Sequence, residues 1–215
     1  MRVLTAMRGP IHHHLRADER GVAFVEFALI APVLLFLILG GLEVVNYALA
    51  QLKVNQIAMT VADNAGRVTT GIDEANVYEV FAGANVIGQS MDFQSKGRIV
   101  LSSLQDNEQK GGKHGQMINW QRCWGDLATP PAYGAEGAGR KDNSLAQGMG
   151  ATGNKITSIP GTAVMFVEVS YDYQPLISKT IVPVSGTIRR ESAFNVRGRQ
   201  NNNISNAQGL KVQAC

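Results

Sequence analysis

The sequence predicts an α+β protein with a long N-terminal helix, a second helix and an antiparallel sheet of roughly four strands. Three observations lead to this fold class. Residues 22–42 form an almost uninterrupted apolar run, apolar residues continue at helical spacing to about residue 65, and four later segments are rich in strand-forming residues. We therefore expect a helical N-terminal part followed by an α+β body.

The composition fits one globular domain with an anchor. Of 215 residues, 45% are hydrophobic, and 20 Lys and Arg stand against 17 Asp and Glu. Residues 1–20 contain four arginines and two acidic residues, a net charge of +2, which leaves a net charge of +1 on the rest of the chain. Because phosphate binding needs basic residues clustered on one surface, we expect no nucleic-acid partner.

The apolar run of residues 22–42 is long enough to cross a membrane once. As a helix it spans about 30 Å, the thickness of a bilayer core. Four arginines precede the run, whereas Lys53 is the only basic residue among the twenty that follow it. The positive-inside rule then places the N-terminus in the cytoplasm and the body across the membrane.

Glu26 is the only charged residue in this run. A carboxylate inside a membrane helix costs a few kcal/mol, so it is a candidate functional group that needs a partner. It also lies shortly after Arg20, close enough to the start of the run for its side chain to reach the cytoplasmic interface. The residues alone leave both interpretations open.

Pro32 falls in the middle of the predicted helix. A proline there removes one backbone hydrogen bond and kinks the segment, which membrane helices tolerate better than soluble ones. The kink can be functional or without function.

Beyond the run, apolar residues with helical spacing extend the predicted helix to about residue 65, with an end near Gly66. The second half is thus amphipathic, with one stripe for its own domain. The stripe consists of Val44, Ala48, Leu52, Val54, Ala58, Val61 and Ala65.

A competing interpretation comes from Ala48 and Ala50, whose A-x-A spacing is typical of a signal peptidase site. Cleavage after Ala50 would release a soluble protein that begins at Gln51. The apolar run is longer than the 7–15 residues typical of such signals, and helical spacing continues through the proposed cut.

The body is predicted to contain one helix and four strands. A helix over residues 73–88 begins with two acidic residues and places Val77, Val80, Phe81 and Ala84 on one face. Strands are expected over residues 97–104, 115–124, 163–173 and 187–197, and a polar turn joins the first two as a hairpin. In the third strand Met165, Val167, Val169, Tyr171 and Tyr173 are expected to face the core, with Glu168, Ser170 and Asp172 outward.

Residues 125–158 are rich in glycine, with two prolines and few large apolar residues. We expect a mobile surface loop that buries little surface. An insertion that contacts a partner is the functional alternative.

The two cysteines, Cys123 and Cys215, lie far apart and form no C-x-x-C motif. They can form one disulfide if the body is exported to an oxidising compartment, and stay free thiols in a reducing one.

The sequence offers little for catalysis or metal binding. His114 is the only histidine outside the leader, where His12, His13 and His14 lie. No nucleophile elbow, P-loop or dinucleotide-binding motif is present. We expect no cofactor, no metal site and no enzymatic activity.

The N-terminal region resembles a known class of signal. A short basic leader ends at Gly21, four residues "VAFV" follow, and Glu26 and Phe27 precede a long apolar helix, as in the class III signals of type IV prepilins. The string "GVAFVEFALIAPVLLFLILGGLEVVNYAL" is similar to the TadE-like family, minor pseudopilins of tight-adherence (Tad/Flp, type IVb) pilus systems. The features that match are Gly21, Glu26, Phe27, Ala31, Pro32, Gly40, Gly41 and Glu43. The segments "VEVSYDYQPLISKTI" and "IRRESAFNVRGR" match the family more loosely.

The resemblance implies a pilin-like subunit with a leader over residues 1–21, a spine helix over 22–66 and an exported domain over 67–215. A prepilin peptidase would cut after Gly21, leaving a cationic amine at Val22 that Glu26 of a neighbouring subunit neutralises. Glu26 and Phe27 would be assembly residues. The implied partners are the peptidase, other pilin and pseudopilin subunits, the inner-membrane assembly platform and membrane lipid.

Two further readings stay open. The chain can be an uncleaved single-pass protein of the cell envelope whose body is a scaffold or binding module. It can also be a secreted soluble protein cut after Ala50, with a hydrolase as the remotest case. A related pilus-locus class carries a von Willebrand-type domain, but its D-x-S-x-S motif is absent here.

Overall fold

The computed structural model describes residues 20–177, 186–199 and 201–215. The chain divides into two compact units, Met1–Val45 and Asn46–Cys215. The predicted leader lies outside the described residues except for its last two positions. The histidines of the leader lie outside them as well.

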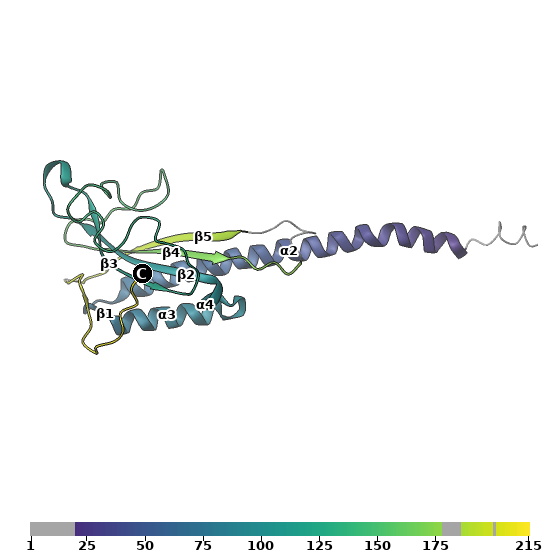
Figure 1. Cartoon of the computed structure of the whole chain (residues 1–215), viewed down its shortest axis with the longest axis horizontal. Helices are drawn as coiled ribbons and strands as arrows, with labels where there is room; N and C mark the ends of the chain where they lie inside the picture. The colour runs from purple at the N-terminus through teal and green to yellow at the C-terminus, as the bar shows by residue number, and fades with distance from the viewer. Residues whose placement is uncertain (1–19, 178–185, 200) are drawn as a thin grey trace, which may run out of the picture. The chain divides into compact units, whose positions relative to one another are not determined.

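One helix, α2 (Arg20–Arg67), runs through the whole N-terminal part (Figure 1). It continues through Pro32 and through the proposed cleavage point after Ala50. The prediction of a single helix from the apolar run to about residue 65 is confirmed. Arg199 caps its C-terminal end, because the guanidinium donates to the carbonyl oxygens of Ala65 and Val68, each at 2.8 Å.

The buried stripe of α2 differs from the predicted one in its first part. Val54, Ala58, Val61 and Ala65 are buried as expected, whereas Val44, Ala48 and Leu52 are exposed. Leu52 precedes Val54 by two residues, about 200° around the helix, so it lies on the opposite side. The buried face continues backward through Ala50 instead, four residues before Val54.

The second helix, α3 (Glu74–Gly88), has Asp73 as its N-cap. The Asp73 carboxylate accepts from the Ala75 amide at 3.1 Å, and the Asn76 side chain accepts from the Asp73 amide at 3.0 Å. The predicted apolar face is confirmed, since its four residues are buried. Two short segments, η1 (Gln89–Met91) and α4 (Phe93–Lys96), lead from α3 into the sheet.

The four predicted strands form one antiparallel sheet with the order β3-β2-β4-β5. They are β2 (Gly97–Asp106), β3 (Gln116–Trp124), β4 (Val164–Asp172) and β5 (Thr187–Asn195). The hairpin of β2 and β3 is present, with the short η2 (Gly111–Lys113) in its turn and a register shift after Ser103. Two short strands, β1 (Ile72–Asp73) and β6 (Ile204–Ser205), pair in parallel.

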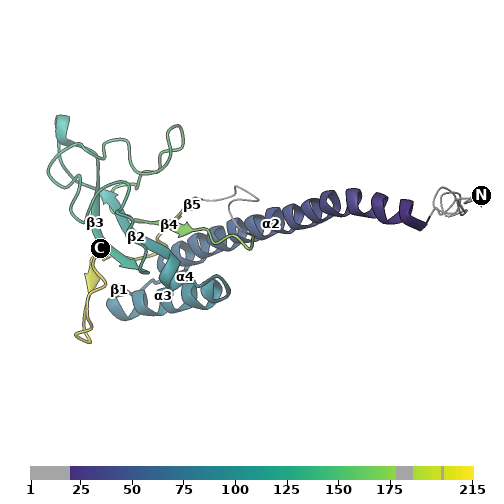
Figure 2. The same cartoon turned by 45° about the vertical axis from the view of Figure 1, so that its right-hand side comes forward.

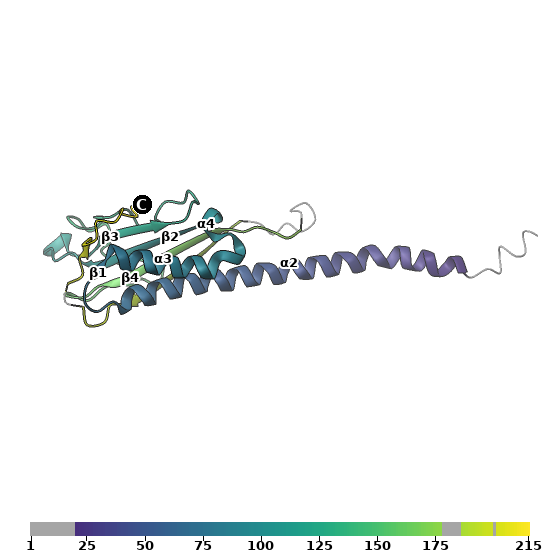
Figure 3. The same ribbon diagram turned by 90° about the horizontal axis from the view of Figure 1, so that it is seen from below.

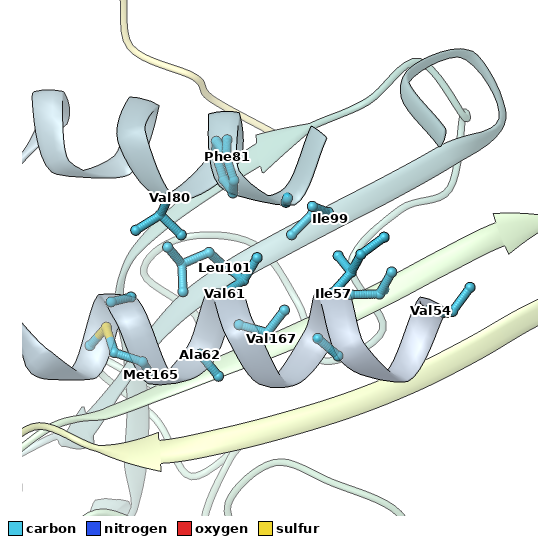
Figure 4. Packing of buried hydrophobic residues seen from close by; sticks show 14 of the residues in the cluster. Val54, Ile57, Val61, Ala62, Val80, Phe81, Ile99, Leu101, Met165 and Val167 are labelled. Carbon is cyan, nitrogen blue, oxygen red and sulfur yellow. The ribbon is translucent and has the colours of Figure 1, made fainter. Parts of the chain in front are cut away.

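The main core lies between the sheet and two helices on one of its faces. The part of α2 from Asn46 onward and α3 both cover this face (Figure 3). Figure 4 shows how the helix side chains meet those of the central strands β2 and β4. The labelled residues are Val54, Ile57, Val61 and Ala62 from α2, Val80 and Phe81 from α3, Ile99 and Leu101 from β2, and Met165 and Val167 from β4.

The glycine-rich segment covers the other face of the sheet, which corrects the prediction of a loop that buries little surface. Figure 2 shows it on the side of the strands away from α3. Leu145 and Met149 join a second core with residues of β2, β3 and β4. The segment also bonds to the edge of β3, where the Ile118 amide donates to the Ala138 carbonyl oxygen at 2.9 Å.

This cover also corrects the outward positions expected on β4. Glu168 and Ser170 are buried, although their side chains do point away from the main core, and Asp172 is half-buried. Alternation of apolar and polar residues identified the two faces of the strand. It could not show that a distant segment covers the polar face.

The C-terminal tail is fixed beside β3 (Figure 1). Cys123 and Cys215 form a disulfide with their Cα atoms 4.9 Å apart, and the Cys123 amide donates to the Gln213 carbonyl oxygen at 2.7 Å. The Tyr78 hydroxyl on α3 donates to the Lys211 carbonyl oxygen at 2.7 Å. The tail therefore connects β3 to α3.

Replacing Arg199 should destabilise the body. Arg199→Met keeps the length of the side chain but leaves two helix-terminal carbonyl groups without their donor, at a cost of about 1–3 kcal/mol. Urea unfolding of the full chain in detergent measures this loss. Arg67→Met is the matched control, because Arg67 is exposed and forms a surface ion pair with Asp63. Equal stability of both variants would contradict the capping role.

Candidate assembly site on the N-terminal helix

The first unit presents an apolar surface on all sides of α2. Phe24 is 78% exposed, Phe27 69% and Leu29 71%, and residues 22–39 contain no buried position. Among the described residues, α2 is the single helix long and apolar enough to be a candidate membrane span, with a mean hydropathy of 2.7 over an 18-residue stretch. Such a surface needs lipid or other helices around it.

Glu26 projects from this apolar surface. It lies one turn after Val22 and one turn before Ile30, and all three are exposed. Within the part of the chain that the structure describes, no hydrogen bond or ion pair is found for its carboxylate. A partner for this charge must therefore be sought in solvent, in the lipid interface or in another chain.

Gly21 and Val22 lie in the first turn of α2. The backbone N–H groups of a first turn have no partner within the helix, so local opening costs least there. Within the described residues, nothing outside its chain neighbours and its own turn of helix backbone lies within 4 Å of the position that a Cβ on Gly21 would take. The bond between Gly21 and Val22 is therefore among the easiest of this helix to expose.

The predicted assembly residues form one local group. Gly21, Val22, Glu26 and Phe27 follow one another over less than two turns of α2, and Pro32 lies further along the same helix. Cys123 and Cys215 are paired in the body and take no part in this group.

Comparison with known proteins identifies this segment. Residues 21–63 match the family model described as TadE-like protein. The resemblance inferred from the sequence is confirmed over this part of the chain, about a fifth of its length. No curated protein and no solved structure matches the chain. The TadE-like segment associates the protein with Tad pili.

An ion-pair network in the body was not predicted from the sequence. Arg122 on β3 is buried and contacts Glu74 of α3 at 2.6 Å and Glu136 of the glycine-rich segment at 2.8 Å. Burial alone would lower the pKa of Arg122, but hydrogen bonds and charge attraction from both glutamates raise it. The network joins both faces of the sheet, so its arrangement indicates a structural role.

No metal centre is apparent in residues 20–177, 186–199 and 201–215, where no group of three or more His, Cys, Asp or Glu side chains is arranged to hold an ion. His114 lies in the turn between β2 and β3, with its Nδ1 3.8 Å from an Asp106 carboxylate oxygen. The other histidines fall outside the described residues.

The carboxyl group of Glu168 in the body has a strongly raised pKa. Burial raises its pKa to about 7, and the charge of Glu191 contributes in the same direction. Glu191 lies directly opposite on β5 and accepts a hydrogen bond from the Tyr133 hydroxyl at 2.7 Å. One oxygen of Glu168 accepts from the Ala132 amide at 2.8 Å, which lowers the pKa but does not offset burial.

The stability of the body should therefore decrease as pH rises. The folded-state pKa of Glu168, about 7, lies above the usual 4.5, so its contribution is fully present below pH 4.5 and is lost by about pH 7. The shift corresponds to a loss on the order of 3 kcal/mol. Glu168→Gln should remove most of this pH dependence in urea unfolding between these pH values.

Glu79→Gln on α3 is the matched control, because Glu79 is exposed. It should unfold with the pH dependence of the wild type. If Glu168→Gln and the wild type show the same pH dependence, Glu168 is not the group responsible.

Proposed function

We propose that this protein is a minor pseudopilin that takes part in assembly of a Tad/Flp-type pilus. The observation that carries the proposal is the position of Glu26. It is the single charge of the exposed apolar run of residues 22–42, lies five residues after Gly21, and falls inside the segment that matches TadE-like proteins. The match supports a pilus-related protein in general, and the finer role rests on this group.

The apolar run serves as a single membrane anchor in the bacterial inner membrane. Its length and its exposure on all sides support insertion. The arginines before the run support a cytoplasmic N-terminus, with the body in the periplasm. The disulfide of Cys123 and Cys215 agrees with an oxidising compartment for the body.

A prepilin peptidase removes the leader by hydrolysing the bond between Gly21 and Val22. The position of this bond in the first turn of α2 supports access, because little structure has to open. Hydrolysis creates a cationic α-amine at Val22 in an apolar environment. Such a charge is stabilised by a carboxylate nearby.

Glu26 supplies that carboxylate to the amine of a neighbouring subunit. Both groups lose less on leaving water when they pair than when either is buried alone. Phe27 and the following apolar residues pack against the other subunits, and Pro32 permits the helix to bend. The partners are the peptidase, other pilin and pseudopilin subunits and the assembly platform. The role requires no cofactor and no enzymatic activity.

The reading as a secreted protein cut after Ala50 has less support. The bond between Ala50 and Gln51 lies in the interior of α2, and Ala50 is 8% exposed and belongs to the main core. Cleavage there would require this part of the helix to open. The alternative of an uncleaved envelope scaffold differs from the proposed function mainly in that the bond after Gly21 stays intact. The mature N-terminus distinguishes the two.

The mature protein should begin at Val22. Intact mass and N-terminal sequencing of protein from its native membrane measure this directly. Gly21→Ala should block processing, whereas the control Gly41→Ala should not, although both positions have open space around an added Cβ. A chain that starts at Met1 indicates an uncleaved scaffold, and one that starts at Gln51 indicates a secreted protein.

Glu26→Ala should be processed normally but reduce pilus assembly by about tenfold or more, because loss of one partner of a buried ion pair costs about 3–5 kcal/mol. Immunoblots report processing, and sheared pilus yield reports assembly. Glu79→Ala, an exposed glutamate of the body, is the control. Normal pilus yield with Glu26→Ala would refute the assembly role of Glu26.

A further inference from the structure

An open cleft of about 420 Å³ lies in the second unit between α2, η1 and the end of β4. Its lining combines apolar and polar side chains. The apolar ones are Leu49, Ala50, Met91 and Leu176, and the polar ones include Asn46, Lys53, Gln89, Ser90, Asp92 and Gln174. The volume falls in the range of small-molecule binding sites.

Hydrogen bonds connect the three walls of this cleft. The side-chain amide of Asn46 on α2 donates to the Tyr173 hydroxyl at 2.7 Å, and the Tyr171 hydroxyl donates to the Met91 carbonyl oxygen at 3.0 Å. The Lys53 ammonium donates to the Ser90 hydroxyl. The cleft is therefore formed by the fold itself and does not depend on an incoming ligand.

Lys53 provides a cation in the cleft. An ammonium group has three donors, and Ser90 uses one of them. The one acidic residue of the lining, Asp92, accepts a hydrogen bond from the Ser95 hydroxyl. Lys53 is the one basic residue of the lining, and its remaining donors favour a ligand with an anionic group.

The cleft begins close to the end of the apolar run. Along α2, Asn46 follows Leu42 by four residues, about 6 Å of helix. If residues 22–42 cross the bilayer, this part of α2 lies at the depth of the lipid headgroups. Leu49 is 52% exposed and Leu176 70% exposed, and both line the cleft. Tyr171 and Tyr173, both buried, form the inner wall of the cleft.

We propose that this cleft binds the headgroup of an anionic phospholipid from the leaflet on the side of the body. The Lys53 ammonium pairs with the lipid phosphate, and the side-chain amide of Gln89 lies in the same lining as a further donor. Leu49 and Leu176 contact the first part of the acyl chains. The inference rests on membrane insertion through residues 22–42, as in the proposed function.

Lipid retention tests this site in the full chain. The protein is inserted into nanodiscs that contain phosphatidylglycerol and phosphatidylcholine, then extracted in mild detergent, and native mass spectrometry counts the lipids that stay bound. The wild type should retain phosphatidylglycerol in preference to phosphatidylcholine. Lys53→Gln should lower this retention about fivefold, the contribution of one lysine at an anionic membrane surface.

Lys110→Gln is the matched control, since Lys110 is exposed in the turn between β2 and β3. It should retain lipid like the wild type. Leu176→Asn is a second variant that leaves the charge intact, and it should weaken retention of both lipids. Peptide mapping of the Cys123–Cys215 disulfide checks that each variant is folded.

Equal retention by Lys53→Gln and the wild type would overturn the inference. Displacement of the retained lipid by inorganic phosphate would also overturn it, because the site would then bind a free anion. Resistance to carbonate extraction is measured first. A chain that carbonate extracts contradicts both the proposed function and the lipid site, whereas an inserted chain without lipid preference contradicts the lipid site alone.

Discussion

The body depends on the packing of one face of α2 against the sheet. From Ala50 to Ala65 this face is buried together with α3 and the central strands. Because α2 continues without a break to Arg20, the same helix also carries an apolar surface that the described part of its own unit does not cover. One helix therefore has an uncovered apolar surface in its first part and packs against the sheet in its second part. The transition falls where its apolar residues become confined to a single stripe.

The second face of the sheet is closed by different means. Residues 125–158 have few large apolar side chains, so apolar packing, an ion pair and backbone hydrogen bonds together attach this segment to the sheet. Leu145 and Met149 enter a small core, Arg122 pairs with Glu136, and backbone hydrogen bonds join the segment to the edge of β3. Polar groups thus become buried here, which explains why Glu168 has an unusual pKa.

The candidate assembly residues have the opposite character, because the helix alone brings them together. Gly21, Val22, Glu26 and Phe27 are close in sequence and are brought together by helix geometry alone. The role proposed for them depends on surroundings that other molecules supply. Such a site can be read from sequence, whereas the cleft at Lys53 can not, because its walls come from three separated segments.

The sequence by itself determined the long helix, the face of α3 and the four strands, because helical and strand periodicity are local properties. The candidate assembly residues came from the resemblance of one short segment to the TadE-like family. Only the tertiary structure decided which side of α2 is buried near Leu52, how the glycine-rich segment packs, and that Cys123 pairs with Cys215. The buried network of Glu74, Arg122 and Glu136 belongs to the same group. These features join residues far apart in the chain, and glycine-rich or isolated polar residues have no periodicity that reveals their partners.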